Sequence, residues 1–218
     1  YHQRTRAFLR FYREEYKVLR KELETPSYFR NRLVSNYIYK GPVLEWYTRI
    51  KLRLERNYEY INSLVPENAQ VVDIGCGYGI ISYMLGFTSE NRNILGIDYD
   101  ENKIELANNC ISKNDRISFV AADAVTYDYP DADVFLLSDV LHYVPRERQA
   151  GLLASCIRRL KPGGKIIIRD ADSDLQKRHL GTRFTEFFST TFGYNNCLDR
   201  SLFFFSGRFI SELASGYN

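Results

Sequence analysis

Short apolar runs alternate with amphipathic stretches between residues 66 and 170. Five runs are rich in β-branched residues, which is typical of strands buried on both faces of a parallel sheet. They cover Val71–Ile74, Ile94–Ile97, Ile117–Ala121, Val134–Leu137 and Lys165–Arg169. Helical patterns of apolar residues follow, and the helices are expected to begin at Ile80, Asp100 and Pro145. This alternation predicts a doubly wound α/β fold, with a mostly parallel sheet and helices on both faces.

The chain before residue 66 has a different pattern, helical and rich in aromatic residues. Apolar positions recur at helical spacing from Phe8 to Leu23 and again from Val43 to Val65, with an aromatic stretch from Tyr28 to Tyr39 between them. We predict that residues 1–65 form a helical extension that packs as a lid on the domain of residues 66–218. Four of its residues are expected to face either a bound ligand or the core: Tyr37, Lys40, Trp46 and Tyr47.

Charge is distributed unevenly along the chain, whose net charge is +3. The first 60 residues contain fourteen Lys or Arg against seven Asp or Glu, and the remainder contains sixteen against twenty. A basic front favours an anionic partner, such as a membrane surface or RNA. The alternative is that these charges only solvate the exposed faces of the helices.

Composition narrows the class of protein further. A chain of 218 residues with 44% hydrophobic content can bury one substantial core. No apolar run is long enough to span a bilayer, and no signal peptide opens the sequence. The cysteines are dispersed, which indicates reduced thiols in a cytoplasmic protein. The first residue is Tyr1 rather than methionine, so we expect an excised or trimmed domain.

The stretch VVDIGCGYGI, residues 71–80, is the strongest candidate for a binding site. A buried strand leads into three alternating glycines, Gly75, Gly77 and Gly79, and a helix begins at Ile80. Glycine allows a sharp turn and a close approach of the backbone to a ligand, and the first turn of a helix offers unpaired amide groups. A strand, a glycine loop and a helix start together predict a nucleotide-binding site.

The spacing G-x-G-x-G after Asp73 differs from the G-x-G-x-x-G fingerprint of dinucleotide-binding proteins. It resembles motif I of the class I S-adenosylmethionine-dependent methyltransferases, in which an acidic residue stands two places before the first glycine. The string LKPGGKIIIRD, residues 160–170, resembles that family's turn into its fifth strand. The resemblance implies a Rossmann-like fold, S-adenosylmethionine as cofactor and S-adenosylhomocysteine as product. It covers residues 66–170 specifically and residues 171–218 loosely, and we expect the family's usual C-terminal β-hairpin to be missing.

The cofactor site is expected along the ends of the first strands. Asp98 follows the second strand about 20 residues after the glycine loop, where an acidic residue grips the ribose hydroxyls. The alternative is that Asp98 only caps the next helix, but Asp100 is better placed to be that cap. Tyr99 follows Asp98, where its ring is expected to lie along the adenine, and the resemblance implies that Asp123 accepts from the exocyclic amine of adenine. The full set of expected cofactor contacts is Asp73, Gly75, Cys76, Gly77, Gly79, Asp98, Tyr99, Ala122, Asp123, Ala124 and Ser138.

Catalytic residues are expected after the fourth strand, because ligands of open α/β sheets bind beyond the carboxyl ends of the strands. Asp139, His142 and Tyr143 stand there. Histidine titrates near neutral pH, which suits His142 to the role of general base; the alternative is a structural histidine in the core. The three histidines are too scattered to suggest a metal site.

The sequence therefore predicts a methyltransferase that acts by direct in-line displacement on a small aromatic, acyl or lipid-like acceptor. Enzymes that methylate base amines usually carry an Asn/Asp-Pro-Pro-aromatic run after this strand, and this chain has Ser138–Leu141 instead. Two alternatives stay open, an RNA methyltransferase and a non-catalytic cofactor-binding domain of a larger protein. The chain also resembles, loosely, the methyltransferase half of bacterial acyltransferase–methyltransferase fusions. Its basic front would place it at a membrane surface.

Overall fold

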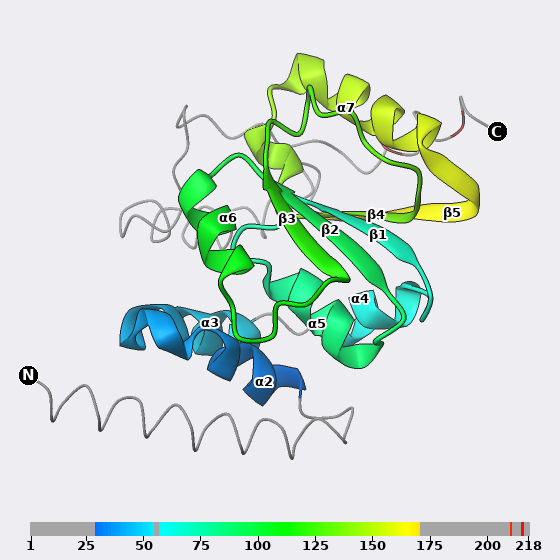
Figure 1. Cartoon of the computed structure of the whole chain (residues 1–218). Coiled ribbons are helices and arrows are strands. Elements are labelled where there is room, and N and C mark those ends of the chain that lie inside the picture. Colours follow the sequence, from blue (N-terminus) through cyan, green and yellow to red (C-terminus); the bar gives the residue numbers. More distant parts are fainter. Residues whose placement is uncertain (1–28, 55–56, 171–209, 211–214, 216–218) are drawn as a thin grey trace, which may run out of the picture.

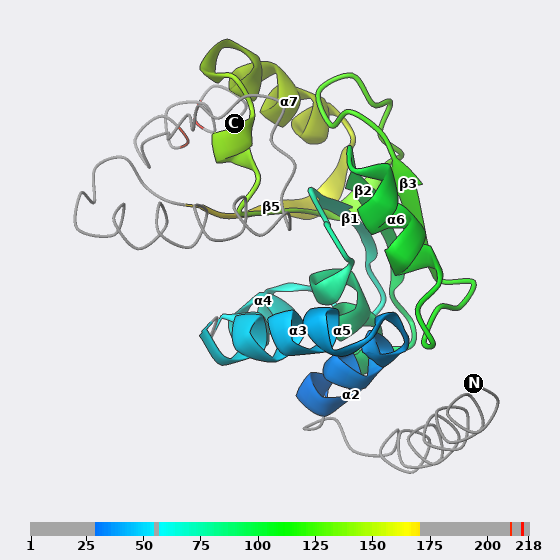
Figure 2. The same ribbon diagram turned by 90° about the vertical axis from the view of Figure 1, so that its left-hand side faces the viewer.

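The computed structural model describes residues 29–54, 57–170, 210 and 215, and within them a five-stranded sheet is covered by helices on both faces (Figures 1 and 2). The strands are β1 (Gln70–Ile74), β2 (Asn93–Asp98), β3 (Ile117–Ala121), β4 (Ala132–Ser138) and β5 (Leu160–Arg169). The helices are α2 (Phe29–Asn36), α3 (Pro42–Leu54), α4 (Tyr58–Leu64), α5 (Ile80–Thr88), α6 (Glu101–Asn108) and α7 (Arg146–Arg158), with short 3-10 turns η2 (Ile38–Lys40) and η3 (Leu141–Tyr143). The predicted helix at residues 8–23 and the expectation of a missing hairpin after residue 170 lie outside the described residues.

All strand pairs are parallel, and the strands lie in the order β3-β2-β1-β4-β5. In β1, Ile74 stands opposite Ile97 of β2 on one side and opposite Leu137 of β4 on the other. The direction of winding therefore reverses between β1 and β4. In open α/β sheets this switch point, at the carboxyl ends of the strands, is where ligands bind.

Successive residues of the central strands point to opposite faces of the sheet, as the strand geometry requires. Val71 and Leu136 belong to a core cluster shared with α2 to α6, whereas Val72 and Phe135 belong to a second cluster under α7. Figure 2 shows the two helical layers, with α5 on one side of the sheet and α7 on the other. The predicted α/β fold with helices on both faces is confirmed.

Helix boundaries agree with the prediction in one place and differ in another. Asp100 caps α6, where its Oδ1 accepts from the N–H groups of Asn102 at 3.1 Å and Lys103 at 3.3 Å. The prediction of one helix from Val43 to Val65 was wrong, because α3 ends at Leu54 and α4 begins after Asn57. The apolar spacing continues across the break, and asparagine favours helix ends rather than interiors.

The described part of the N-terminal extension shares its core with the sheet. Leu33, Tyr37 and Tyr58 are buried in the same cluster as the strands. The guanidinium of Arg92, 3% exposed, donates to the carbonyls of Val65 at 2.5 Å and Leu85 at 3.0 Å, which ties the ends of α4 and α5 together. The segment is therefore an integral layer of the fold; its role as a lid stays a prediction.

Candidate functional site

The loop after β1 is tied to the end of β2 by three backbone donors. The N–H groups of Gly75 and Cys76 both donate to the Ile97 carbonyl, at 2.7 Å and 3.0 Å. The N–H of Gly77 donates to Oδ2 of Asp98 at 2.8 Å. Because the strands are parallel and adjacent, the glycine loop and the predicted ribose-binding carboxylate form one unit.

Asp98 is held in place and retains capacity for a ligand. Its Oδ1 accepts from the N–H of Asp100 at 3.0 Å, and the residue is 8% exposed. A carboxylate has about four acceptor sites on its two oxygens. Two backbone bonds orient the group, and the remaining lone pairs can accept from vicinal hydroxyls. Tyr99, which follows it, is 45% exposed at the same end of the strand.

Gly75 and Gly77 differ in what surrounds them. A β-carbon on Gly75 would lie 2.4 Å from Cγ2 of Val140, so the loop after β4 packs directly on the loop after β1. A β-carbon on Gly77, at φ 55°, would meet no atom within 4 Å. The backbone at Gly77 therefore faces open space beside Asp98, as a ligand approaching the loop requires.

Asp73 lies beneath the glycine loop and is 2% exposed. Its Oδ2 accepts from the hydroxyl of Ser82 on α5 at 2.6 Å. Burial raises the pKa of the Asp73 carboxyl to about 7, the Ser82 hydrogen bond opposes that rise, and the Asp98 carboxylate adds to it. This geometry makes Asp73 a support of the loop, and its expected contact with a cofactor stays a prediction. Sequence reasoning missed Ser82, which carried no motif signal.

Burial also raises the pKa of the Cys76 thiol well above its usual value, and Asp73 and Asp98 act in the same direction. Thiolate is the reactive form of cysteine. Burial and the two carboxylates therefore disfavour the reactive thiolate of Cys76, whose backbone N–H is bonded to the Ile97 carbonyl.

The loop after β3 reaches the same edge of the sheet. The N–H of Ala122 donates to the carbonyl of Asp98 at 2.9 Å. Oδ1 of Asp123 accepts from the N–H of Val125 at 2.9 Å, while 53% of the Asp123 side chain is exposed. Ala124 is turned toward the core side of the loop, where its carbonyl accepts from the Tyr129 hydroxyl at 2.5 Å. The structure thus brings Asp123 to the edge at which Asp98 lies.

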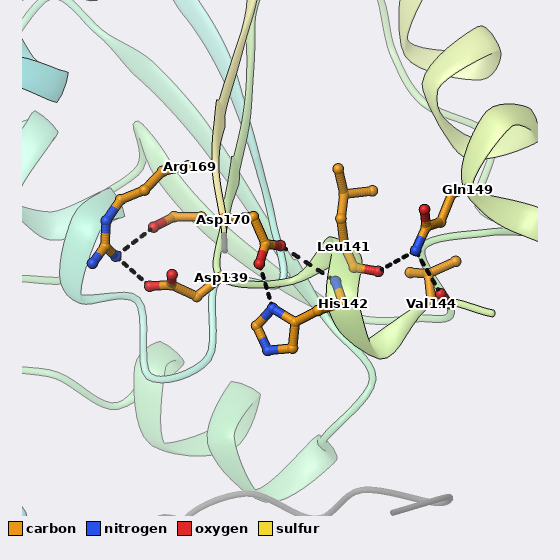
Figure 3. Close-up of polar contacts among 8 residues, drawn as sticks. Asp139, Leu141, His142, Val144, Gln149, Arg169 and Asp170 are labelled. Atoms are coloured by element: carbon orange, nitrogen blue, oxygen red, sulfur yellow. Dashed lines mark hydrogen bonds and ion pairs between the residues drawn. The ribbon is translucent and has the colours of Figure 1, made fainter. Parts of the chain in front are cut away.

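An ion pair joins the ends of β4 and β5. Arg169 donates through Nη1 to Oδ2 of Asp139 (Figure 3). The same Nη1 donates to the hydroxyl of Ser138 at 3.3 Å. Asp139 has φ 56°, a left-handed conformation that aspartate tolerates better than most residues. About a third of each charged side chain is exposed, 27% for Arg169 and 32% for Asp139. Asp139 is therefore committed to a cation, which disfavours it as a base.

His142 is fully buried and faces a second carboxylate. Its Nδ1 lies 2.5 Å from Oδ1 of Asp170, and its backbone N–H donates to Oδ2 of the same residue at 3.3 Å (Figure 3). Both side chains are at most 1% exposed. The centroid of the Tyr143 ring lies 4.2 Å from the centroid of the His142 imidazole. In the neutral tautomer that donates from Nδ1 to Asp170, Nε2 is the nitrogen that can accept a proton.

The predicted cofactor residues after β1, β2 and β3 lie together at the carboxyl-end edge of the sheet. The predicted catalytic residues after β4 lie beside them, because Val140 packs on Gly75. Sequence reasoning missed Arg169 and Asp170, although both belong to the string that resembles the family's fifth strand. Their position at the carboxyl end of that strand was the available signal.

Comparison with known proteins agrees with this arrangement. Residues 72–168 match the family model described as a methyltransferase domain. A phosphoethanolamine N-methyltransferase of Plasmodium falciparum is 31% identical over 137 residues, which are 62% of this chain and 47% of that protein. A 27-O-demethylrifamycin SV methyltransferase of Amycolatopsis mediterranei is 33% identical over 106 residues, 46% of this chain and 38% of that protein.

The chain thus spans less than half the length of these two curated relatives. Among solved structures, human N-acetylserotonin methyltransferase in complex with S-adenosylmethionine superposes with a TM-score of 0.55 at 18% identity, over 80% of this chain and 49% of that one. This likeness shows the fold. Residues 72–168 are therefore identified as a methyltransferase domain by the family model that they match, and the solved structure agrees with this in fold.

Proposed function

We propose that the chain binds S-adenosylmethionine along the carboxyl ends of β1, β2 and β3, and transfers its methyl group to a small-molecule acceptor held at the ends of β4 and β5. The observation that carries the proposal is that the loop after β1 contacts both the end of β2 and the loop after β4. Gly77 is bonded to Asp98, and Gly75 is packed against Val140. A cofactor beside Gly77 is therefore adjacent to the β4 loop, where an acceptor can meet its methyl carbon.

The cofactor supplies an electrophilic methyl group on a sulfonium ion, so the protein has to bind and align the reactants. Asp98 suits the ribose hydroxyls because its carboxylate is already oriented by two backbone bonds. Tyr99 and Asp123 are exposed at the same edge and suit the adenine ring and its amine. Ser138 ends β4, and Ala122 and Ala124 belong to the loop after β3, at the same edge.

The proposed acceptor site, at the ends of β4 and β5, suits a methyl acceptor that must lose a proton during the transfer. For a phenol or an enol, the oxygen would attack the methyl carbon, the carbon–sulfur bond would break, and its electron pair would stay on sulfur. The acceptor proton would pass to Nε2 of His142, whose Nδ1 is bonded to Asp170. His142 is fully buried, so the role requires the acceptor to reach Nε2 from the side away from Asp170. A carboxylate acceptor would need no base.

Two relatives support a small-molecule acceptor, because their names specify phosphoethanolamine and a demethylrifamycin as the methylated compounds. Ser138 and Asp139 are engaged with Arg169, and the run Ser138–Leu141 has neither the prolines nor the aromatic residue of a base clamp.

We also propose a cytoplasmic location with association at membrane surfaces. Cys76, Cys110 and Cys156 are free thiols, which suits a reducing compartment. Half of the fourteen Lys and Arg side chains that would face anionic lipid lie in residues 1–28, outside the described residues. Among the described helices, none is long and apolar enough to cross a bilayer. Flotation with vesicles of anionic and of neutral lipid tests the association, which should need the anionic lipid.

The proposed activity is tested by transfer of a labelled methyl group. The chain is incubated with methyl-labelled S-adenosylmethionine and, separately, with phosphoethanolamine, a set of phenols and a set of carboxylic acids. We expect one class to yield a product heavier by one methyl group, together with S-adenosylhomocysteine. Asp98→Asn should lose the activity, whereas Asp131→Asn, an exposed carboxylate before β4, should retain it. Binding of the cofactor with no transfer to any acceptor class, including a cell extract, would favour a non-catalytic domain.

A further inference from the structure

The described N-terminal segment, residues 29–54, contacts the glycine loop from the core cluster that α2 to α6 share with the sheet. The hydroxyl of Tyr37 donates to the carbonyl of Tyr78 at 2.7 Å, and Tyr37 is fully buried. Tyr78 is the residue between the second and third glycines of the loop. Tyr37 follows α2, which packs on α5, the helix that begins at the end of this loop (Figure 2). Of the two alternatives expected for Tyr37, a bound ligand or the core, the structure shows the core, and its hydroxyl contacts the loop.

This hydrogen bond fixes one peptide plane of the loop from both sides. The carbonyl of Tyr78 accepts from Tyr37, and the N–H of Gly79 in the same peptide unit donates to the carbonyl of Cys76 at 2.9 Å. Rotation of that plane would break both bonds at once. Since the Tyr37 phenol is buried, its pKa is raised well above the usual value, and the hydroxyl remains a donor at every working pH.

The Tyr78 side chain is held as well. Its ring meets the ring of Tyr47 edge-on at 5.9 Å, and Nζ of Lys103 lies 5.7 Å from its centroid. Tyr47 comes from α3 and Lys103 from α6. The loop residue is therefore contacted by the N-terminal segment through both its backbone and its side chain.

We propose that Tyr37 is a positioning residue for the cofactor: it holds the Tyr78 peptide in the conformation that binds S-adenosylmethionine, so that the N-terminal segment sets the cofactor affinity. This inference rests on the proposed function. Loss of the hydrogen bond lowers the fraction of molecules whose loop is competent to bind, and the apparent Kd rises as the inverse of that fraction.

The chain offers a matched control in Tyr39. Its hydroxyl donates to the Leu106 carbonyl on α6 at 2.8 Å, so it is a similar bond from the same segment to a different element. Tyr37→Phe and Tyr39→Phe each remove one hydroxyl and keep the ring. A purely structural role predicts that both variants lower the melting temperature and leave the Kd of S-adenosylhomocysteine unchanged.

The experiment measures two quantities on wild type and on both variants. The first is the Kd of S-adenosylhomocysteine by calorimetry, and the second is hydrogen exchange of the peptide covering residues 75–79. We expect Tyr37→Phe to raise the Kd about five- to tenfold, since a buried hydrogen bond typically contributes about 1 kcal/mol. It should also speed exchange in that peptide, whereas Tyr39→Phe should change neither quantity by more than about twofold.

Equal Kd values and equal exchange in Tyr37→Phe and wild type would overturn the inference. Equal changes in Tyr37→Phe and Tyr39→Phe would overturn it too, because they would indicate general loosening of the segment. Failure of wild type to bind S-adenosylhomocysteine would instead contradict the proposed function. The exchange measurement would still decide whether Tyr37 holds the loop.

Discussion

Replacing the first two loop glycines by alanine, one at a time, should separate the stability of the fold from its capacity to bind. At Gly75 the new methyl would lie 2.4 Å from Cγ2 and 2.7 Å from Cβ of Val140, and φ is 71°. At Gly77 it would meet nothing within 4 Å, and φ is 55°. Both variants therefore place alanine in a left-handed backbone conformation, and only Gly75→Ala adds a steric overlap with Val140.

The magnitudes follow from these two contributions. A left-handed conformation costs an L-residue about 1–2 kcal/mol, and a forced overlap in a packed region costs about 1–3 kcal/mol. Gly75→Ala should therefore lose about 2–5 kcal/mol of unfolding free energy, and Gly77→Ala about 1–2 kcal/mol. Against a typical total of about 5–15 kcal/mol, only the first loss threatens the fold.

Urea unfolding measures the stabilities, and calorimetric titration with S-adenosylhomocysteine measures the binding. Gly77→Ala should stay folded and still bind at least about tenfold more weakly, because its methyl occupies the space beside Asp98. Adding Val140→Ala to Gly75→Ala should recover part of the lost stability, since it removes Cγ2 and leaves Cβ. A Gly77→Ala variant that binds like wild type, or is the less stable of the two, would refute the reasoning.

Two further predictions concern buried polar groups. Because the pKa of Asp73 is about 7 in the folded chain and about 3.8 otherwise, protonated Asp73 favours folding and its contribution is lost as pH rises from about 4 to about 7. The unfolding free energies from urea titrations at pH 5 and pH 8 should differ more for wild type than for Asp73→Asn, by about 2–3 kcal/mol, and equal differences would contradict this. His142→Ala should lower turnover of a proton-bearing acceptor at least about 100-fold with the cofactor Kd unchanged, and Asp170→Asn should lower kcat with little change in KM. Near-normal turnover in His142→Ala would return that histidine to a structural role.

Much of the sheet was predictable because each strand carries its own signal. Val71 and Val72 are β-branched and buried on opposite faces, which is what a short apolar run in a parallel sheet indicates. Asp100 was predictable as a cap because the aspartate and the helical pattern are adjacent in sequence. In each case a local preference and the final fold agree.

Other features depend on contacts between residues far apart in the chain. The pair His142–Asp170 spans 28 residues, and the bond from Tyr37 to the Tyr78 carbonyl spans 41. Apolar spacing indicates which face of a helix is buried, and it does not show which backbone group a buried hydroxyl meets. The same spacing continues across Asn57, so the division between α3 and α4 was not predicted.

Asp98 provides the most direct test of the central claim, that this edge of the sheet binds the cofactor. Asp98→Asn keeps the size of the side chain and an oxygen for one backbone bond, while it removes the charge and half of the acceptor capacity. Calorimetric titration with S-adenosylhomocysteine should show one saturable site in wild type and in the control Asp131→Asn. The Kd should rise at least about tenfold, or about 1.4 kcal/mol, in a folded Asp98→Asn. Absence of binding to wild type, or equal affinity in Asp98→Asn, would contradict the account.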